Sequence, residues 1–112
     1  MSEEQQHIHP REQLSDALSH PVRFSITAAV AATDEIEFAA VRDYLQVSDS
    51  VLSRQASQLE EAGILKIRKG FVGKKPRTWF SLSKEGREIW NQHLAALKAI
   101  ALGLPESESE TS

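Results

Sequence analysis

One segment limits most strongly what this 112-residue chain can fold into, because it carries both the start and the stop signal of a helix. In VSDSVLSRQASQLEEAGIL, Ser48 is expected to cap the helix, since its hydroxyl can accept an otherwise unpaired amide proton. Gly63 is the expected left-handed stop. Apolar side chains recur with the spacing of one helix face at Leu52, Ala56 and Leu59. The segment therefore predicts a helix over about 49–62 with one buried stripe.

The neighbouring segments extend this helix into a recognisable order of elements. A helical pattern over 39–45 is joined to it by the two residues Gln46 and Val47, which predicts a helix-turn-helix. After residue 64 the apolar period changes from 3.6 to 2, which predicts the two strands of a hairpin. Their connection, KGFVGKKPR, is expected to be a projecting loop too long for a two-residue turn. A last helix should follow Ser83, over about 84–102.

The N-terminal part predicts further helices ahead of this unit. Residues 10–18 have room for a short helix with Leu14 and Leu18 on one face, and a second helix should begin at Pro21. The stretch around residues 36–38 is too short for more than a bridge of strand. The length, with 40% hydrophobic and 26% charged residues, predicts one folded domain over 10–104, between mobile tails at 1–9 and 105–112.

From His20 to about Ala101 the chain resembles the winged-helix transcription regulators of the MarR and ArsR type. The resemblance is carried by HPVRFSI, by the capped helix segment above, and by KPRTWFSLSKEGREIW. It implies a mostly α winged helix-turn-helix fold with a small β-hairpin in a two- to three-stranded antiparallel wing sheet. It also implies that the second helix of the pair enters the DNA major groove. The hairpin tip would touch backbone or minor groove, and the last helix would help to build a dimer.

The helix face opposite the buried stripe supplies candidates for DNA contact, which are Ser50, Ser53, Arg54, Ser57 and Gln58. Arg54 is the one side chain among them that can make a bidentate contact to a guanine edge. Asp49 is repelled by phosphates and is expected instead to strengthen the helix start. The alternative is a polar helix face that only meets water. Gln55 lies at the edge of the buried stripe, where it could serve packing.

The charge distribution points to a second contact. The net charge is -3, but residues 1–62 carry -7, residues 63–87 carry +7 and residues 88–112 carry -3. The cations around the hairpin connection that are expected on the phosphate backbone are Lys69, Lys74, Lys75 and Arg77. The alternative is a charged strand edge that discourages aggregation. Lys66 and Arg68 could extend this patch or meet acidic neighbours such as Glu60 or Glu61. The surrounding acid would keep non-specific DNA affinity low.

The last helix predicts a homodimer because it has more apolar width than one docking face needs. One stripe contains Trp90, Leu94, Leu97, Ala101 and Leu104, and a neighbouring stripe contains Ile89, Ala96 and Ile100. One should pack on the core and the other on a second subunit, unless the 10–18 helix covers it within the chain. A two-fold dimer would read a near-palindromic site.

Other chemistry is not indicated. The chain has no cysteine, and the four histidines His7, His9, His20 and His93 are interpreted as tail or surface residues rather than metal ligands. No catalytic motif, secretory signal or membrane-spanning run is present, so we expect a cytoplasmic protein that is not an enzyme. No cofactor is predicted, and no small-molecule effector is identified.

The sequence thus predicts a sequence-specific regulator that binds double-stranded DNA as a homodimer. The alternatives are a winged-helix module whose basic wing binds an acidic protein, and, more weakly, RNA binding.

Overall fold

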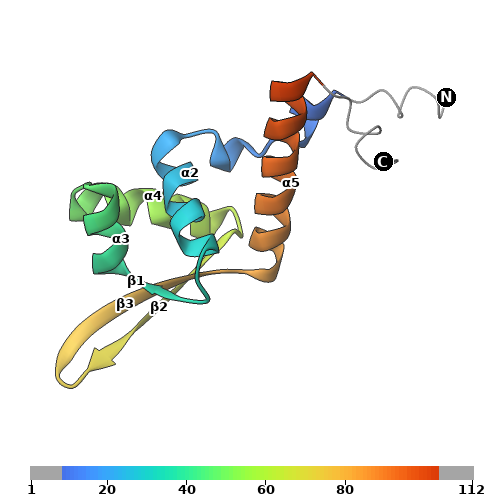
Figure 1. Cartoon of the computed structure of the whole chain (residues 1–112). Coiled ribbons are helices and arrows are strands. Elements are labelled where there is room, and N and C mark those ends of the chain that lie inside the picture. Colours follow the sequence, from blue (N-terminus) through green and yellow to red (C-terminus); the bar gives the residue numbers. More distant parts are fainter. Residues whose placement is uncertain (1–8, 104–112) are drawn as a thin grey trace.

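The computed structural model describes residues 9–103, and its elements follow the predicted order (Figure 1). Along the chain these are the 3₁₀ turns η1 (Pro10–Gln13) and η2 (Asp16–Leu18), helix α2 (Pro21–Ala31), strand β1 (Ile36–Glu37), helices α3 (Phe38–Leu45) and α4 (Asp49–Glu61), strands β2 (Leu65–Val72) and β3 (Lys75–Leu82), and helix α5 (Lys84–Leu102). The fold is a winged helix-turn-helix: α3 and α4 form the helix pair, and β2 and β3 form the wing. This confirms the predicted fold class.

Helix α4 begins and ends where its sequence signals place it. The Ser48 hydroxyl accepts a hydrogen bond from the backbone N–H of Val51 at 3.1 Å, which satisfies one of the unpaired amides of the first turn. At the other end Gly63 has a φ of +80°, and the amides of Gly63 and Ile64 donate to carbonyls of the last turn. This pair of bonds is a Schellman motif. The bounds of α4 are therefore set by local hydrogen bonds at both of its ends.

The wing is longer and more regular than predicted. The antiparallel sheet has the strand order β1-β3-β2, and β2 pairs with β3 without interruption as far as Val72 and Lys75. The expectation of a long loop is wrong: Gly73 and Lys74 alone form the turn, with a φ of +63° at Gly73. Positive φ at the first central residue suits a tight hairpin turn. Pro76 fits in the strand because β1 is too short to pair with β3 there, so its missing N–H costs no ladder bond.

The hydrophobic core joins the sheet to α2, α4 and α5. Its largest fully buried apolar side chains are Phe80, Leu18, Ile26, Leu52, Leu59, Ile64, Val30 and Val41. Phe80 of the central strand lies 5.7 Å, ring to ring, from Phe38 at the start of α3. Phe24 of α2 lies 5.0 Å from Trp90 of α5. The core thus holds the helix pair and the base of the wing in one rigid body.

The N-terminal segment differs from the predicted helix over 10–18. It forms two 3₁₀ turns separated by extended backbone at Leu14 and Ser15. The Ser15 amide donates to Nδ1 of His93 at 3.0 Å, so a tertiary hydrogen bond replaces the helical one at this point. Leu18 is 2% exposed and belongs to the core. The helical spacing of Leu14 and Leu18 was therefore a misleading signal. The segment is held instead by the hydrogen bond from Ser15 to His93 and by the burial of Leu18 in the core.

His93 corrects the interpretation of the histidines as tail or surface residues. Its side chain is buried between the N-terminal segment and Phe24, whose ring centroid lies 5.9 Å away. His20 and His9 accept hydrogen bonds as the caps of α2 and η1, from the amides of Val22 and Arg11. His7 lies outside the described residues. Within residues 9–103 no group of three or more potential ligands is arranged to hold a metal ion.

Burial lowers the pKa of His93, and this predicts a loss of stability in mild acid. The unfolded chain takes up a proton at this site at a higher pH than the folded protein does. Its contribution is therefore complete above about pH 6.5, and is lost as pH falls from there toward the lowered folded pKa. We expect urea unfolding to show a smaller free energy at pH 5.5 than at pH 7.5. In His93→Gln, whose amide oxygen can accept the Ser15 N–H but does not titrate, the difference should shrink. An equal pH dependence in both proteins would contradict the assignment.

Helix α5 is joined tightly to the start of the wing. The Ser83 hydroxyl accepts from the Gly86 amide at 2.7 Å and donates to the Gly63 carbonyl at 2.6 Å. Gly86 lies against the backbone of Ile64, so closely that a Cβ on this glycine would lie 2.0 Å from the Ile64 carbonyl oxygen. A single serine therefore caps α5 and ties it to the end of α4.

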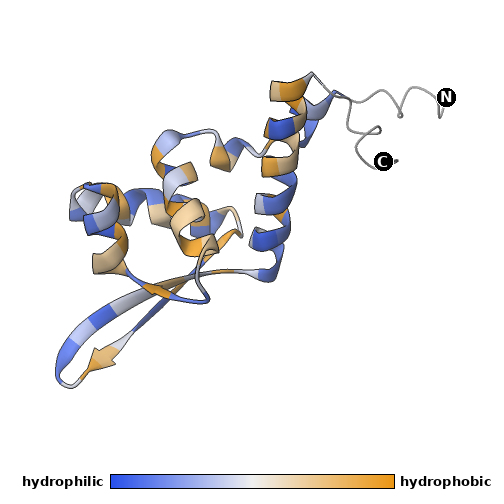
Figure 2. Ribbon diagram, in the orientation of Figure 1, coloured by the Kyte–Doolittle hydropathy of each residue, from blue (hydrophilic) through white to orange (hydrophobic). Residues whose placement is uncertain are grey.

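The two predicted apolar stripes of α5 are divided differently in the structure. The buried face contains Trp90, His93, Ala96 and Ala99. This face packs on the core and on η1, which covers part of the helix in place of the predicted 10–18 helix. The large apolar side chains left exposed are Leu94, Leu97, Ile100 and Leu102, at 38–59%. Figure 2 shows hydrophobic residues on the part of α5 farthest from the wing. Leu104 lies outside the described residues, and no described helix is long and apolar enough to cross a membrane.

Candidate nucleic-acid interface

The outer face of α4 carries the side chains that the sequence predicted for DNA contact. Exposed on this face are Ser50, Ser53, Arg54, Ser57 and Gln58, together with Asp49. The opposite face buries Leu52, Gln55, Ala56 and Leu59, so Gln55 belongs to the packed side. Four of the predicted residues and Asp49 line one shallow depression. The predicted division of the helix into a buried and a free face is therefore observed.

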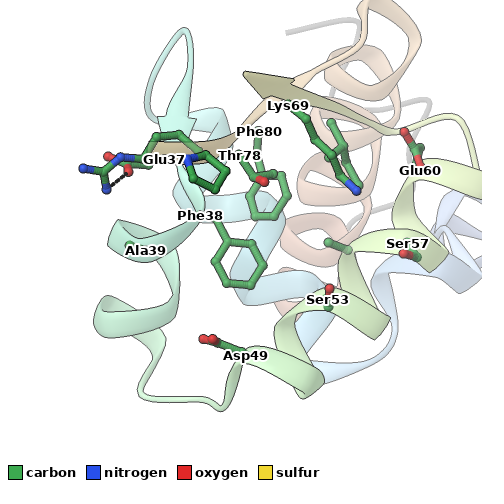
Figure 3. A pocket seen from close by; sticks show the side chains of 14 residues that line it. Glu37, Phe38, Ala39, Asp49, Ser53, Ser57, Glu60, Lys69, Thr78 and Phe80 are labelled. Atoms are coloured by element: carbon green, nitrogen blue, oxygen red, sulfur yellow. Dashed lines mark hydrogen bonds and ion pairs between the residues drawn. The ribbon is translucent and has the colours of Figure 1, made fainter. Parts of the chain in front are cut away.

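A groove of about 770 Å³ lies between α4 and the wing (Figure 3). The α4 wall carries Ser53 and Ser57 together with the acidic Asp49 and Glu60. The hairpin wall includes Lys69, Arg77 and Thr78. Figure 3 shows both serines on the α4 ribbon and Lys69 on the strand across from them. The two predicted contact regions, the helix face and the wing, therefore border one continuous concave surface.

Two glutamines of α4, one buried and one on the exposed face, are held by an arginine of α2. The guanidinium of Arg23 on α2 donates to the side-chain oxygens of Gln55 at 2.9 Å and of Gln58 at 2.8 Å. Its Nε also donates to the Ala17 carbonyl at 2.7 Å. The side-chain oxygen of Gln58 is thus already hydrogen-bonded, and this bond positions the side-chain amide of Gln58, which is one of the predicted DNA contacts.

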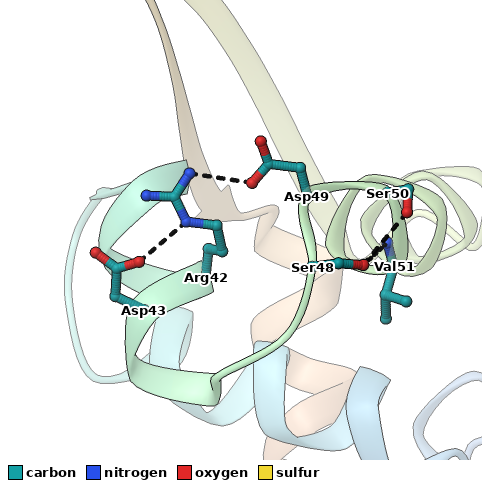
Figure 4. Close-up of polar contacts among 6 residues, drawn as sticks. All are labelled: Arg42, Asp43, Ser48, Asp49, Ser50 and Val51. Atoms are coloured by element: carbon teal, nitrogen blue, oxygen red, sulfur yellow. Dashed lines mark hydrogen bonds and ion pairs between the residues drawn. The ribbon is translucent and has the colours of Figure 1, made fainter.

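The start of α4 is joined to α3 by an ion pair (Figure 4). Arg42 of α3 lies 3.0 Å from Asp49 at the first position of α4, and also 3.0 Å from its neighbour Asp43. Hydrogen bonds to Asp43 and Asp49 raise the pKa of Arg42 further above its ordinary value. Asp49 lies in the first turn of α4, where the helix dipole favours a negative charge, and it holds an arginine beside the candidate interface.

Two wing arginines are paired with acidic residues in β1 and immediately before it. Arg68 makes two 2.9 Å contacts to the carboxylate of Glu35, and its guanidinium lies 4.1 Å from the ring centroid of Trp79. The hydrogen bond from Arg68 lowers the pKa of Glu35. Arg77 contacts Glu37 at 2.9 Å, while its buried Nε has no partner among the described residues. Arg68 thus forms an ion pair with an acidic residue, which was one of the two expectations for it, but its partner is Glu35 rather than Glu60 or Glu61.

The remaining wing cations are free of such pairs. Lys69, Lys74 and Lys75 are exposed, and within residues 9–103 none of them makes an ion pair. Arg54 on α4 is likewise exposed and unpaired within that range. The cations beside the groove that are available to a new anionic partner therefore lie on the helix face and on the outer half of the wing. Exposed cations without an ion pair in the described range also occur elsewhere, at Arg11, Lys66, Lys84, Arg87 and Lys98.

Residues 22–101 match a family model described as a winged helix DNA-binding domain. This chain belongs to that family. The winged-helix domain also resembles solved regulators: a transcriptional regulator homologue from Pyrococcus horikoshii is 27% identical, with a TM-score of 0.74, over 80% of this chain and 88% of that one. Two structures, each 14% identical, share the fold. A homodimeric domain of Mb0332 from Mycobacterium bovis has a TM-score of 0.65 over 82% of both chains. Bacillus subtilis PadR in complex with operator DNA has 0.59 over 67% of this chain and 47% of PadR. No curated protein matches the sequence.

The sequence did not predict the residues that hold side chains of α4 and of the wing in place through hydrogen bonds and ion pairs. Arg23, Glu35, Glu37 and Arg42 each bind a residue of α4 or of the wing from another element. Their sequence separations, up to 40 residues, leave no periodic signal. The two glutamates could have been noticed as acids flanking a short strand, but their arginine partners follow only from the strand register.

Proposed function

We propose that this winged-helix protein is a sequence-specific transcription regulator that binds double-stranded DNA as a homodimer. The observation that carries the proposal is the position of Arg54, unpaired within residues 9–103, on the exposed α4 face, beside a groove whose far wall is the cationic wing. A helix with its side chains is about 10–12 Å across, which fits a major groove about 12 Å wide. Helix α4 would read base edges there, while the wing lysines bind phosphates.

Arg54 is the residue that should discriminate between base pairs. After selection of bound fragments from a random DNA pool, Arg54→Ala should bind the selected site about 5- to 150-fold more weakly, as expected for a lost bidentate guanine contact. Its affinity for unrelated DNA should change much less. Gel-shift titration at one fixed salt concentration measures both. Arg11→Ala, at the far end of the molecule on η1, is the matched loss of one exposed charge and should leave the preference intact. Equal loss in both variants would refute base readout by Arg54.

The exposed apolar side chains of α5 support the homodimer part of the proposal. Leu94, Leu97 and Ile100 are exposed on the C-terminal half of α5, between residues of its buried face. Covering such a patch with a second copy removes it from water. The homodimeric state of the similar Mb0332 domain supports the same arrangement. A two-fold axis there would present two α4 helices to a site with half-sites about 34 Å apart.

A charge in this patch should separate the subunits. Leu94→Glu with Leu97→Glu is expected to shift the protein from dimer to monomer in sedimentation equilibrium, because two carboxylates would be buried without partners. Binding to a two-half-site duplex should weaken, while a single half-site should be affected little. Ala95→Glu adds a charge to an exposed position of the same helix outside the patch and should remain dimeric. A monomeric wild-type protein would contradict the dimer proposal but not DNA binding.

A further inference from the structure

The tip of the wing exposes two large apolar side chains whose burial the fold itself does not provide. Phe71 is 71% exposed and Val72 is 55% exposed, although both lie at the end of a regular strand. Figure 2 shows this end of β2 as hydrophobic, at the point of the hairpin farthest from the body of the protein. Two adjacent large apolar side chains at the end of a projecting hairpin form an apolar surface that a partner can cover.

The strand register places these two side chains on opposite faces of the hairpin. Phe71 pairs with Pro76, and two residues further along Lys69 pairs with Thr78. Side chains alternate along a strand, so these four share one face. This is the face whose Lys69, Pro76 and Thr78 line the groove beside α4. Phe71 therefore continues the candidate DNA-binding surface outward, whereas Val72 points to the other side.

The tip is supported by a rigid base. Trp79 packs over Gly70, so that a Cβ on this glycine would lie 3.2 Å from the indole ring. The guanidinium of Arg68 stacks on the Trp79 ring and forms an ion pair with Glu35. Because the pair next to a two-residue turn is hydrogen-bonded, the next pair, Phe71 with Pro76, is of the closer, non-bonded kind. The rigid proline ring thus lies directly across from the phenylalanine ring.

The charges around the tip indicate its partner. Among the residues of β3 that pair with β1, Trp79 is the one nearest the tip of the wing. From Trp79 to Lys75 at the turn, the two-stranded hairpin extends by four residues, roughly 13 Å at 3.3 Å per residue. Along this distance it carries Lys69, Lys74 and Lys75, which have no ion pair among the described residues. Lys69 lies on the same face as Phe71, Lys74 lies in the turn, and Lys75 lies on the opposite face. An apolar side chain with lysines on either side of it along the ribbon fits a surface with apolar faces between rows of anions, which describes the sugar and base edges of a DNA minor groove between its phosphates.

We propose that Phe71, backed by Pro76, is an apolar wedge that enters the minor groove next to the major groove occupied by α4 and partly unstacks one base step. This rests on the proposed DNA-binding function and adds to it a second source of specificity. Apolar wedges of this kind kink the duplex, and pyrimidine–purine steps unstack most easily. The protein would therefore select deformable steps at a fixed distance from the bases read by Arg54.

The test places 2-aminopurine, whose fluorescence rises on unstacking, at successive positions flanking the selected site in synthetic duplexes. Binding of the wild-type protein is expected to raise the fluorescence several-fold at one step in each flank. Phe71→Ser should abolish this rise and weaken binding about tenfold, within the range for a lost aromatic–base contact. Val72→Ser is the matched control, an apolar-to-serine change on the opposite face, and should keep both the rise and the affinity.

The outcomes separate the wedge from the function on which it rests. A wild-type protein that binds no duplex would overturn both, whereas tight binding with unchanged fluorescence at every flanking position would overturn the wedge alone. So would an unchanged complex with Phe71→Ser. The same two variants are compared for self-association by sedimentation and for binding to phosphatidylserine-containing vesicles. Loss of dimerisation or of vesicle binding in Phe71→Ser, with an unchanged DNA complex, would assign the tip to that partner instead.

Discussion

Replacing Gly86 with alanine is expected to lower the free energy of unfolding by about 2 kcal/mol or more. In a helix interior alanine is ordinarily better than glycine by about 1 kcal/mol, so propensity alone predicts the opposite sign. Here the new Cβ would lie 2.0 Å from the Ile64 carbonyl oxygen and 2.8 Å from two further backbone atoms of that residue. Backbone cannot move aside as a flexible side chain can, and overpacking of this kind costs about 1–3 kcal/mol or more. Urea unfolding at pH 7.5 measures the change.

Gly63→Ala is the comparison that separates steric from conformational cost. Gly63 has a φ of +80° but has no atom within 4 Å of the Cβ position, apart from its chain neighbours. Alanine there should therefore cost only about 1–2 kcal/mol, for the left-handed conformation. If Gly86→Ala proved as stable as the wild type, α5 would have to pack less tightly on the end of α4 than the structure shows.

Removing the free wing cations should produce the largest change in DNA affinity. In Lys69→Ala with Lys74→Ala and Lys75→Ala, we expect the affinity for any duplex at 0.15 M salt to fall by about two orders of magnitude. This follows because each phosphate contact contributes a slope of about 0.9 in the plot of log K against log salt, roughly fivefold at that salt concentration. The slope itself should become shallower by about 2.7. Fluorescence anisotropy over a series of salt concentrations measures both quantities.

The control for this prediction removes lysines elsewhere. Lys84 and Lys98 are exposed on α5, away from the groove, and Lys84→Ala with Lys98→Ala should change the slope little. Because the wing lysines contact phosphates rather than bases, cognate and unrelated DNA should weaken alike. A triple variant that lost affinity for the selected site alone, at constant salt slope, would contradict the assigned role.

Local signals predicted the helix pair well because their physics is local. The cap at Ser48, the stop at Gly63 and the buried stripe between them act within a few residues of each other, so the bounds of α4 follow from its own sequence. The same holds for Ser83 at the start of α5. The division of α4 into a packed and a polar face followed from the same periodicity, and with it the exposed position of Arg54.

Sequence patterns gave wrong predictions where the local structure depends on residues far away along the chain. The glycines and the proline of KGFVGKKPR suggested a loop, but a proline can lie in a strand whose neighbouring edge is open, and only the sheet order shows that edge. Leu14 and Leu18 have helical spacing, yet the hydrogen bond from Ser15 to His93, 78 residues away, decides the backbone there. His93 appeared to be a surface residue because nothing in its neighbourhood along the chain indicates what covers it.

By itself, then, the amino-acid sequence determined the winged helix-turn-helix order of elements, the polar face of α4 and the concentration of positive charge in the wing. Tertiary structure alone decided which of those charges are free. Arg68 and Arg77 are held by Glu35 and Glu37, in and just before β1 and more than 30 residues away. In the part of the chain that the structure describes, Lys69, Lys74 and Lys75 remain unpaired. Whether a charge is available depends on its neighbours in space, and strand pairing brings those neighbours together from distant parts of the chain.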